Sequence, residues 1–325
     1  MKRNSPARLE KNLAIAAEAS KVLLNAAELL RQSLPTEQAH ALSPMQRRRR
    51  AATQPGVVAA RRLNKAAGIL AFSVLADSAI EHYRGSFHNR AMYTPLGVSL
   101  LSLALSGHGV ADRRESTHLL RDLGYSAAIL TGLAGTAFHV YNVGKRPGRF
   151  SWENLFYSAP LGAPGAMLLS GIVGFMAERV RGATPGRTSR FLGLPAGRLT
   201  AALTALGLVG TSAEAALLHF RGAYHDPFMY VPVTLAPVAA AAMGEIAVGA
   251  PKRDRALSRW WLRLTAAMGA VGVAFHAFGI HRNMGGWKNW RQNVLNGPPL
   301  PAPPSFLGLA LAGLAALELL EARPE

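Results

Sequence analysis

Long apolar stretches recur along the chain after residue 65, and each is close to the length that crosses a bilayer. A hydrocarbon core of roughly 30 Å needs about 20 residues of helix. Eight stretches approach this length, at residues 66–83, 94–110, 124–143, 158–178, 199–219, 231–250, 261–280 and 303–321. Several are rich in Ala and Gly, which suits helices whose backbones pack closely in lipid. The pattern predicts an all-α integral membrane protein with eight transmembrane helices.

Composition supports this prediction. Half of the 325 residues are hydrophobic, only 17% are charged, and the mean hydropathy is +0.13, which lies outside the usual balance of soluble domains. The alternative is a buried helical bundle in a soluble protein. We disfavour it because so many consecutive apolar stretches lack a charged face.

The first 65 residues have a different composition and form the first predicted region of the chain. No apolar stretch follows the N-terminal Met and its two basic neighbours, so no cleavable signal is expected. Leucines and alanines recur at helical spacing from Leu9 to Leu30, with charged residues between them, and predict an amphipathic helix that ends near Pro35. This helix is expected to lie on the membrane surface or to bind a protein partner.

Basic residues are distributed unevenly about the predicted spans. With eight spans, 27 of the 36 Lys and Arg residues fall on the side that carries both termini. Because cytoplasmic loops are enriched in Lys and Arg, we predict a bacterial-type inner-membrane protein with both termini in the cytoplasm. The arginine run 47–50 is expected to bind anionic lipid, at about 1 kcal/mol for each basic residue near the surface. Nucleic acid is not an expected partner, because no interleaved aromatic residues accompany the run.

The chain contains an internal repeat at an offset of 137 residues. Residues 76–95 align with residues 213–232, and nine of these twenty positions are identical. A two-residue shift continues the match from the 154–164 segment to the 293–303 segment. The repeat predicts two membrane halves, 66–193 and 194–325. Each half has an even number of spans, so the halves enter the membrane in the same direction and should be related by a pseudo-two-fold axis along the membrane normal.

Four histidines end alternate predicted spans at similar depth on the outer side. They are His82, His139, His219 and His276. Neutral imidazole is a common metal ligand, and two histidines on separate helices can hold haem. Haem b or quinone is therefore the expected cofactor, with these four histidines as its ligands or metal-binding residues. The alternative is that they are interfacial side chains satisfied by water or by backbone carbonyls.

Two acidic residues, Asp77 and Glu214, occupy equivalent positions about 7.5 Å deeper than His82 and His219 at 1.5 Å per residue. A carboxylate inside a span is costly and usually faces the bundle interior, where it serves an ion or proton path. We predict a proton-transfer function for this pair. A neutral acid that is hydrogen-bonded between helices is the alternative.

The segments that follow these spans carry further candidate residues. Arg84 and Arg221 are expected to bind an anionic group such as a haem propionate, to bind a backbone carbonyl, or to snorkel. Each is followed by a glycine, Gly85 or Gly222, which is expected to allow the turn. Tyr93 and Tyr230 complete the predicted cofactor site, and each follows a methionine. Methionine near histidine would suit copper.

The chain has no cysteine, which excludes disulfides and thiolate ligands, and it lacks the sequence motifs of P-loop, dinucleotide-binding, zinc-protease and serine-hydrolase sites. The layout resembles that of the membrane anchor subunits of respiratory dehydrogenases, which exchange electrons with quinone or haem. We therefore expect an electron-transfer subunit with its polar site on the periplasmic side, in contact with a periplasmic or cytoplasmic protein partner. The alternatives are a transporter or copper permease, and a non-catalytic membrane scaffold.

Overall fold

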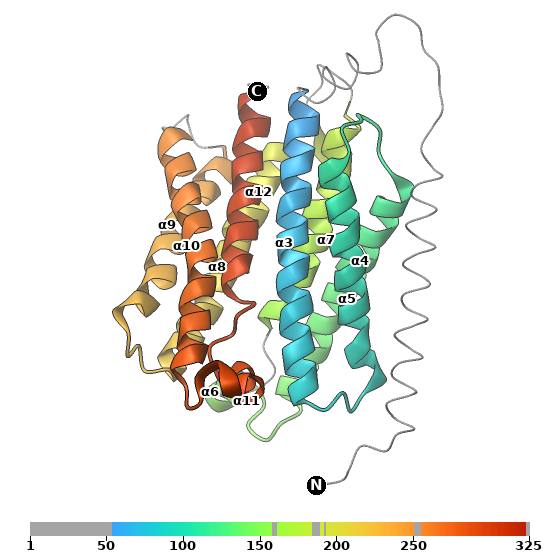
Figure 1. The fold of residues 1–325 in the computed structure, drawn as a ribbon. Helices are drawn as coiled ribbons and strands as arrows, with labels where there is room; N and C mark the ends of the chain where they lie inside the picture. The colour runs from blue at the N-terminus through green and yellow to red at the C-terminus, as the bar shows by residue number, and fades with distance from the viewer. Residues whose placement is uncertain (1–53, 158–160, 184–188, 192, 250–254, 323–325) are drawn as a thin grey trace, which may run out of the picture. The chain divides into compact units, whose positions relative to one another are not determined.

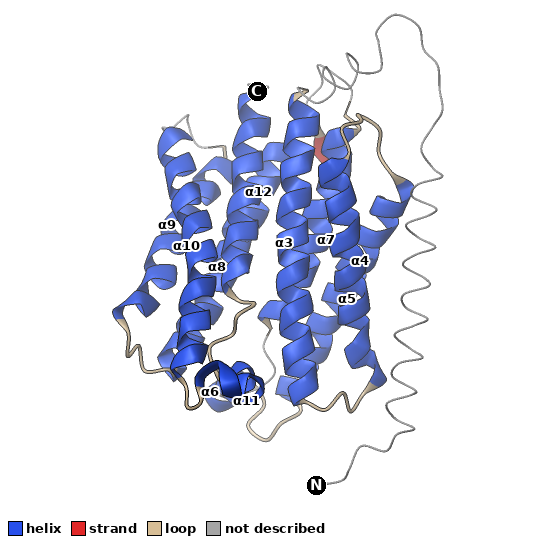
Figure 2. Cartoon of the chain, in the orientation of Figure 1, coloured by secondary structure: helices blue, strands red, loops and turns tan. Residues whose placement is uncertain are grey.

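The computed structural model describes residues 54–157, 161–183, 189–191, 193–249 and 255–322, and most of these residues are helical (Figure 2). The long helices are α3 (Pro55–Arg84), α4 (Thr94–Ala111), α5 (Leu119–Gly144), α7 (Gly162–Arg181), α8 (Ala196–Arg221), α9 (Val231–Ala247), α10 (Arg255–Arg282) and α12 (Pro303–Glu321). The amphipathic helix predicted before Pro35 lies outside the described residues.

Each predicted span overlaps one of these long helices. Proline occupies the first or second helical position of α3, α4, α9 and α12, where its missing N–H costs nothing because the first turn has no acceptor for it. The largest difference is at α3, which begins at Pro55 rather than at residue 66 and therefore includes Arg61, Arg62 and Lys65. These basic residues continue the helix because its first turns need not lie in the apolar core.

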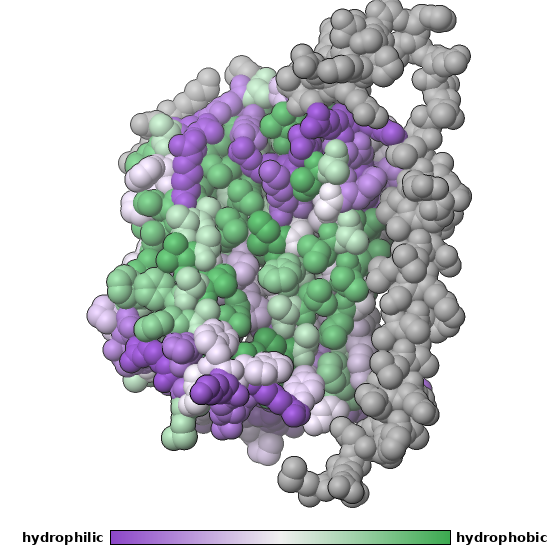
Figure 3. Space-filling model, in the orientation of Figure 1, coloured by the Kyte–Doolittle hydropathy of each residue, from purple (hydrophilic) through white to green (hydrophobic). Residues whose placement is uncertain are grey.

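Seven of the described helices are long and apolar enough to cross a membrane, by length and composition. The eighth, α7, does not meet that measure, because Glu178, Arg179 and Arg181 lie in its last turns. On the face that Figure 3 shows, hydrophobic residues form a band across the middle of the molecule and hydrophilic residues gather at its two ends. Large apolar side chains within the long helices are exposed, as Leu130 of α5 (67% exposed) and Leu206 of α8 (70% exposed) are. These are the features of a membrane-embedded helical protein.

Two helices, α3 and α12, lie at the centre of the bundle (Figure 1). Helix α3 packs against α4, α7 and α12, and α12 packs against α3, α8 and α10. Small residues allow close approach: a Cβ at Gly308 of α12 would lie 3.2 Å from the backbone oxygen of Ala66 in α3. A cluster of buried apolar side chains surrounds α12, with members from α3, α8, α9 and α10.

Short elements connect the long helices. The 3-10 helices are η1 (Arg90–Tyr93), η2 (Pro227–Tyr230) and η3 (Gly286–Asn289), and the short α-helices are α6 (Trp152–Tyr157) and α11 (Trp290–Asn296). Helices α6 and α11 were not expected from the sequence, and they lie at the end of the bundle where α3 finishes (Figure 1). A two-stranded antiparallel sheet, β1 (Arg190–Phe191) with β2 (Leu194–Pro195), precedes α8.

Local contacts recur at the repeat offset. Arg61 donates through Nε to the Val110 carbonyl at 2.7 Å, and Arg198 donates to the Ala247 carbonyl at 3.1 Å. The turns after α3 and α8 are also alike, because each contains two consecutive non-glycine residues with positive φ. These are Ser86 and Phe87 in the first turn, and Ala223 and Tyr224 in the second.

The two glycines of these turns have a different function from the one expected. Gly85 and Gly222 have ordinary φ values of −76° and −83°, so neither supplies the left-handed conformation. A Cβ at Gly85 would lie 3.1 Å from the terminal methyl of Met92, and one at Gly222 would lie 3.0 Å from that of Met229. The glycines therefore allow close packing against a methionine.

Candidate functional site

The histidines of the two turns are held in the same way. Nδ1 of His82 lies 2.6 Å from the Met92 carbonyl oxygen, and Nδ1 of His219 lies 2.7 Å from that of Met229. A carbonyl only accepts hydrogen bonds, so Nδ1 carries the proton in each neutral ring. Nε2 is then the nitrogen that can accept a proton or a ligand.

Aromatic stacking shapes the segment after each of these histidines. The rings of Phe87 and Tyr93 stack with centroids 4.5 Å apart, and those of Tyr224 and Tyr230 stack at the same separation. Tyr230 is 51% exposed. In each turn a residue with positive φ, Phe87 or Tyr224, stacks on the tyrosine that ends the following 3-10 helix. Tyr93 and Tyr230 therefore stabilise the local fold.

The other two histidines of the predicted layer lie close to the first two. His139 interacts electrostatically with His82, and His276 interacts with His219. Nδ1 of His276 donates to the Pro299 carbonyl at 2.7 Å. These interactions connect helices within one half of the sequence. Among the residues that the structure describes, no group of three or more His, Asp or Glu side chains could hold a metal ion.

The two carboxylates of the predicted site come from different halves and interact with each other. Asp77 of α3 interacts electrostatically with Glu214 of α8, and also with its helix neighbours Glu81 and Arg84. Both side chains are partly buried. The structure thus brings together two residues that are 137 positions apart in the sequence.

Glu214 also contacts the first residue of α7. Its carboxylate accepts the backbone N–H of Gly162, and a Cβ at Gly162 would collide with that carboxylate. A helix N-terminus presents unpaired N–H groups and a partial positive charge, which favour an anion. The residue equivalent to Gly162 in the second half is Pro301, which has no N–H to offer. The two carboxylates therefore have different surroundings.

The two predicted arginines bind neighbouring protein groups. Arg84 forms an ion pair with Glu81 at 2.9 Å and donates to the carbonyl of Leu295, in the last turn of α11. Arg221 lies over the ring of Tyr157, 5.5 Å from its centroid. Of the alternatives for Arg84, binding to a backbone carbonyl is the one that the structure contains.

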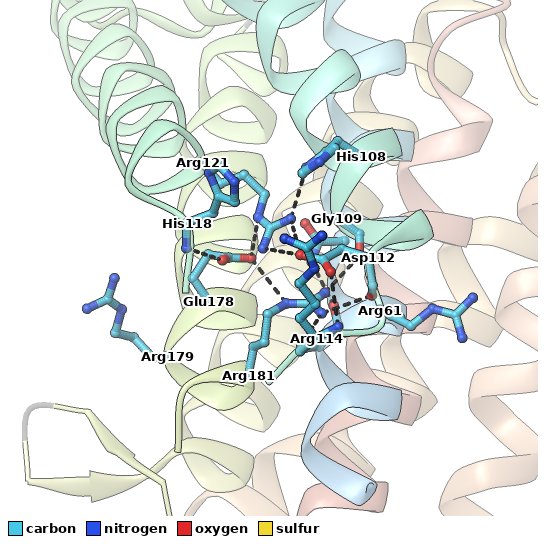
Figure 4. A network of polar contacts seen from close by, with 12 residues as sticks. Arg61, His108, Gly109, Asp112, Arg114, His118, Arg121, Glu178, Arg179 and Arg181 are labelled. Atoms are coloured by element: carbon cyan, nitrogen blue, oxygen red, sulfur yellow. Dashed lines mark hydrogen bonds and ion pairs between the residues drawn. The ribbon is translucent and has the colours of Figure 1, made fainter. Parts of the chain in front are cut away.

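A cluster of buried charges, not identified from the sequence, lies at the opposite end of the bundle, where α4 and α7 finish (Figure 4). We call Asp112, Arg121, Glu178 and Arg181 the charge cluster. Two nitrogens of Arg121 donate to Oδ2 of Asp112 at 2.9 Å, and its Nε pairs with Oε1 of Glu178 at 2.9 Å. The Arg121, Glu178 and Arg181 side chains are fully buried.

Backbone groups complete the charge cluster. Arg181 donates to the carbonyls of Gly109 at 2.7 Å, and of Asp112 and Arg114 at 2.9 Å each. The His118 N–H donates to Glu178 at 3.1 Å. Helices α4, α5 and α7 are thereby joined at this end, with two cations balancing two anions.

Asp112 and His118, two titratable residues of this region, lie in the connection between α4 and α5. Burial lowers the pKa of His118 below its ordinary value, and the neighbouring Arg121 lowers it further. Burial acts to raise the pKa of Asp112, but hydrogen bonds from the Arg114 N–H and from Arg121 outweigh it, so this pKa lies below its ordinary value. At neutral pH the region therefore favours neutral His118 and ionised Asp112.

One signal in the sequence distinguishes the charge cluster from ordinary loop charges. At the repeat offsets its four residues correspond to Gly249, Ser258, Leu317 and Leu320. Charges that only set topology would be expected near both equivalent loops, whereas this set belongs to the first half. Comparison with protein-family models, with curated proteins and with solved structures finds no match for the chain.

Proposed function

We propose that the chain is a multi-pass protein of a bacterial-type inner membrane, built from two parallel four-helix halves with both termini on the cytoplasmic side. The excess of basic residues on that side supports the orientation. The recurrence of the Arg61 and His82 hydrogen bonds at Arg198 and His219 supports the two halves. In this orientation the histidines lie at the outer end and the charge cluster at the inner end.

Within this architecture, we propose that the protein moves protons across the membrane and that Asp77 and Glu214 form the binding site. The observation that carries the proposal is that these equivalent carboxylates are both partly buried within the bundle, where Glu214 accepts the Gly162 N–H at the start of α7 and interacts electrostatically with Asp77. Two neighbouring carboxylates repel each other in a medium of low dielectric, and a bound proton relieves that repulsion. Such residues inside a membrane are costly and typically belong to proton or ion pathways.

Proton flux into liposomes tests this function. Purified protein is reconstituted with a pH-sensitive dye inside the vesicles, and a potassium gradient with valinomycin supplies the driving force. Wild-type protein should acidify the interior faster than protein-free vesicles, and Asp77→Asn and Glu214→Gln should each reduce the rate by at least about tenfold.

The matched control is Glu115→Gln, which removes an exposed carboxylate from the loop before α5. This variant should keep the wild-type rate. A wild-type rate equal to that of empty vesicles, or equal rates for all three variants, would contradict the proposed function.

Electron transfer through haem is the second candidate, and the orientation of the histidines favours it. Nδ1 of His82, His219 and His276 is bound by a backbone carbonyl, which is the usual arrangement of a metal-ligating histidine whose Nε2 binds the metal. Optical spectra of the oxidised and reduced protein test this candidate. A haem band that is lost equally in His219→Ala and His276→Ala, whose side chains interact with each other, would favour electron transfer over proton transport alone.

A further inference from the structure

A line of buried polar side chains runs through the first half between the carboxylates and the charge cluster. We call Asn64, Ser99, Ser102, Ser106, Tyr125 and Ser170 the polar column. All six are almost completely buried, at 0% or 1% exposure. They come from α3, α4, α5 and α7, so the column lies where these four helices meet.

Hydrogen bonds connect five of the six members in two groups, and Ser99, the sixth, donates to the Pro95 carbonyl of its own helix. The Tyr125 hydroxyl donates to Oδ1 of Asn64 at 2.5 Å and lies 3.1 Å from the hydroxyl of Ser106. The hydroxyl of Ser102 lies 3.3 Å from that of Ser170. Ser99, Ser102 and Ser106 lie three and four residues apart in α4, which places them on one face of that helix.

Each end of the column approaches a charged site. Tyr125 interacts electrostatically with Glu178 and Arg121 of the charge cluster. At the other end, the antiparallel packing of α3 and α4 brings Gly68 against Ser106. The same register places Ser99 level with residue 75, two residues or about 3 Å inward of Asp77 at 1.5 Å per residue. The column therefore spans the distance between the carboxylate pair and the inner end of the bundle.

The second half contains apolar residues at all six equivalent positions. At the repeat offsets the polar column corresponds to Ala201, Ala236, Ala239, Met243, Leu262 and Leu309. All six of these residues belong to one buried hydrophobic cluster, and none is more than 1% exposed. At these six positions the same helix arrangement is thus filled in one half by hydroxyl and amide groups and in the other by aliphatic side chains. The buried threonines of the second half, Thr200, Thr204 and Thr265, each donate to a carbonyl of their own helix.

This difference is informative because burying polar groups away from water is unfavourable compared with burying apolar groups. The second half demonstrates that aliphatic side chains can fill this position between the helices. Packing alone therefore does not require the hydroxyls of the first half. Polar side chains buried within a bundle at membrane depth are typical of pathways for protons or polar solutes.

We propose that the proton path runs through the first half only, along the polar column, and that the second half at this depth is a dry scaffold. The proposal rests on the proposed proton transport. Each hydroxyl in such a path accepts a proton on its oxygen and releases its own proton to the next group, so no member of the column changes its charge after a transfer. The charge cluster closes the inner end of the path.

Water access to the column can be tested directly, because the natural chain has no cysteine. Ser102→Cys and Ser106→Cys introduce one thiol each into the column. Ala239→Cys and Met243→Cys introduce thiols at the equivalent positions of the second half. Each variant, in membrane vesicles, is treated with a charged methanethiosulfonate reagent, and the mass of the intact protein measures labelling.

Thiols react as hydrated thiolates, so a wet path should make positions 102 and 106 react at least about tenfold faster than positions 239 and 243. Equal and slow labelling at all four positions would overturn the proposal, because the column would then be a dry packing contact. This result does not depend on whether the wild-type protein conducts protons.

A second experiment removes one hydroxyl and keeps the packing. Tyr125→Phe retains the ring, which packs against Gly174 of α7, and removes the group that connects Asn64 with Ser106. The matched control is Thr204→Val, which removes a buried hydroxyl of the second half that donates at 2.8 Å to the Thr200 carbonyl. Flux should fall at least about tenfold in the first variant and remain at the wild-type rate in the second.

The outcomes separate this proposal from the proposed function. Loss of flux in Asp77→Asn, together with wild-type flux in Tyr125→Phe, would retain proton transport and reject the column as its path. Equal loss in Tyr125→Phe and Thr204→Val would also reject it, since both halves would then contribute alike. Thermal unfolding of both variants shows whether either loss reflects a damaged fold.

Discussion

At the scale of single residues, the candidate site depends on contacts that leave no room for change. Glu214 lies against Gly162 at the start of α7, so the site needs a residue there without a side chain. The charge cluster is equally constrained, because removing one partner of a buried ion pair leaves an uncompensated charge and typically costs about 3–5 kcal/mol. At both places, the Glu214–Gly162 contact and the charge cluster, the polar groups depend on one specific set of neighbours for their hydrogen bonds and ion pairs.

Gly162→Ala should displace the Glu214 carboxylate from the N-terminus of α7 and destabilise the protein by about 1–3 kcal/mol, as expected for overpacking. Gly165→Ala, on the same helix, is the matched control, because a Cβ there would meet nothing within 4 Å. That control should be neutral or stabilising by up to about 1 kcal/mol, owing to the better helix propensity of alanine. Thermal unfolding in detergent measures both. Similar melting temperatures for the two variants would show that the Glu214–Gly162 contact contributes nothing.

At the scale of elements, equivalent helices of the two halves end in similar turns but bury different side chains between them. The turns after α3 and α8 repeat the same hydrogen bonds and stacked rings. The ends of α4, α5 and α7, in contrast, are joined by the buried charge cluster, whose equivalent positions are Gly249, Ser258, Leu317 and Leu320. The Arg259–Glu321 ion pair that joins α10 and α12 is partly exposed. The junction of α4, α5 and α7 should make the stability of the first half sensitive to pH.

Acidification from about pH 7.5 to about pH 5.5 should lower the stability of the α4–α5 connection through His118. Its folded pKa is below the ordinary value, so the unfolded chain binds a proton first as the pH falls, and folding becomes less favourable. Further loss should follow at lower pH as Asp112, whose folded pKa is also depressed, becomes protonated. The titratable and charged groups that face His118 are His108, Asp112, Arg114, Arg121, Glu178 and Arg181.

Melting temperatures across this pH range, compared between wild type and His118→Gln, measure the effect. The variant should show a flatter dependence between about pH 7 and about pH 5.5. His88→Gln, which removes an exposed histidine from the turn after α3, is the control and should behave as wild type. The explanation fails if His118→Gln and wild type lose stability in parallel.

At the scale of the whole molecule, the apolar band and the hydrophilic ends place the bundle in a membrane (Figure 3). The charge balance reinforces this placement, because a formal net charge of +18 on so apolar a chain favours the side of the bilayer with anionic lipid. In the proposed orientation the carboxylate pair lies nearer the outer surface and the charge cluster nearer the inner surface, and these are the two ends of the proposed path.

Reporter fusions test the orientation of the whole chain. Fusions after His88, Pro147, Asp226 and Gly285 should all report the outer side, because each follows a helix that runs outward. A fusion after Glu115 is the control and should report the cytoplasm. A cytoplasmic signal from any two of the first four fusions would reject the topology.

Local sequence determined a large part of this protein. The length and apolar character of each stretch located the long helices, since a helix in lipid must satisfy its backbone internally and present apolar side chains. The repeat offset identified Asp77 with Glu214 and His82 with His219, because duplicated segments keep their spacing. The prolines at helix starts and the uneven distribution of Lys and Arg are likewise visible in the sequence, because neither depends on contacts between helices.

Only the tertiary structure decided which face of each helix meets which neighbour. Nearly apolar helices have little amphipathic pattern, so the sequence does not define their rotation about their own axes. The contact of Glu214 with Gly162 and the joining of Asp112, Arg121 and Glu178 depend on that rotation. So does the convergence of Asn64, Ser106 and Tyr125, because a small change in the packing of three helices would separate groups that are far apart in the sequence.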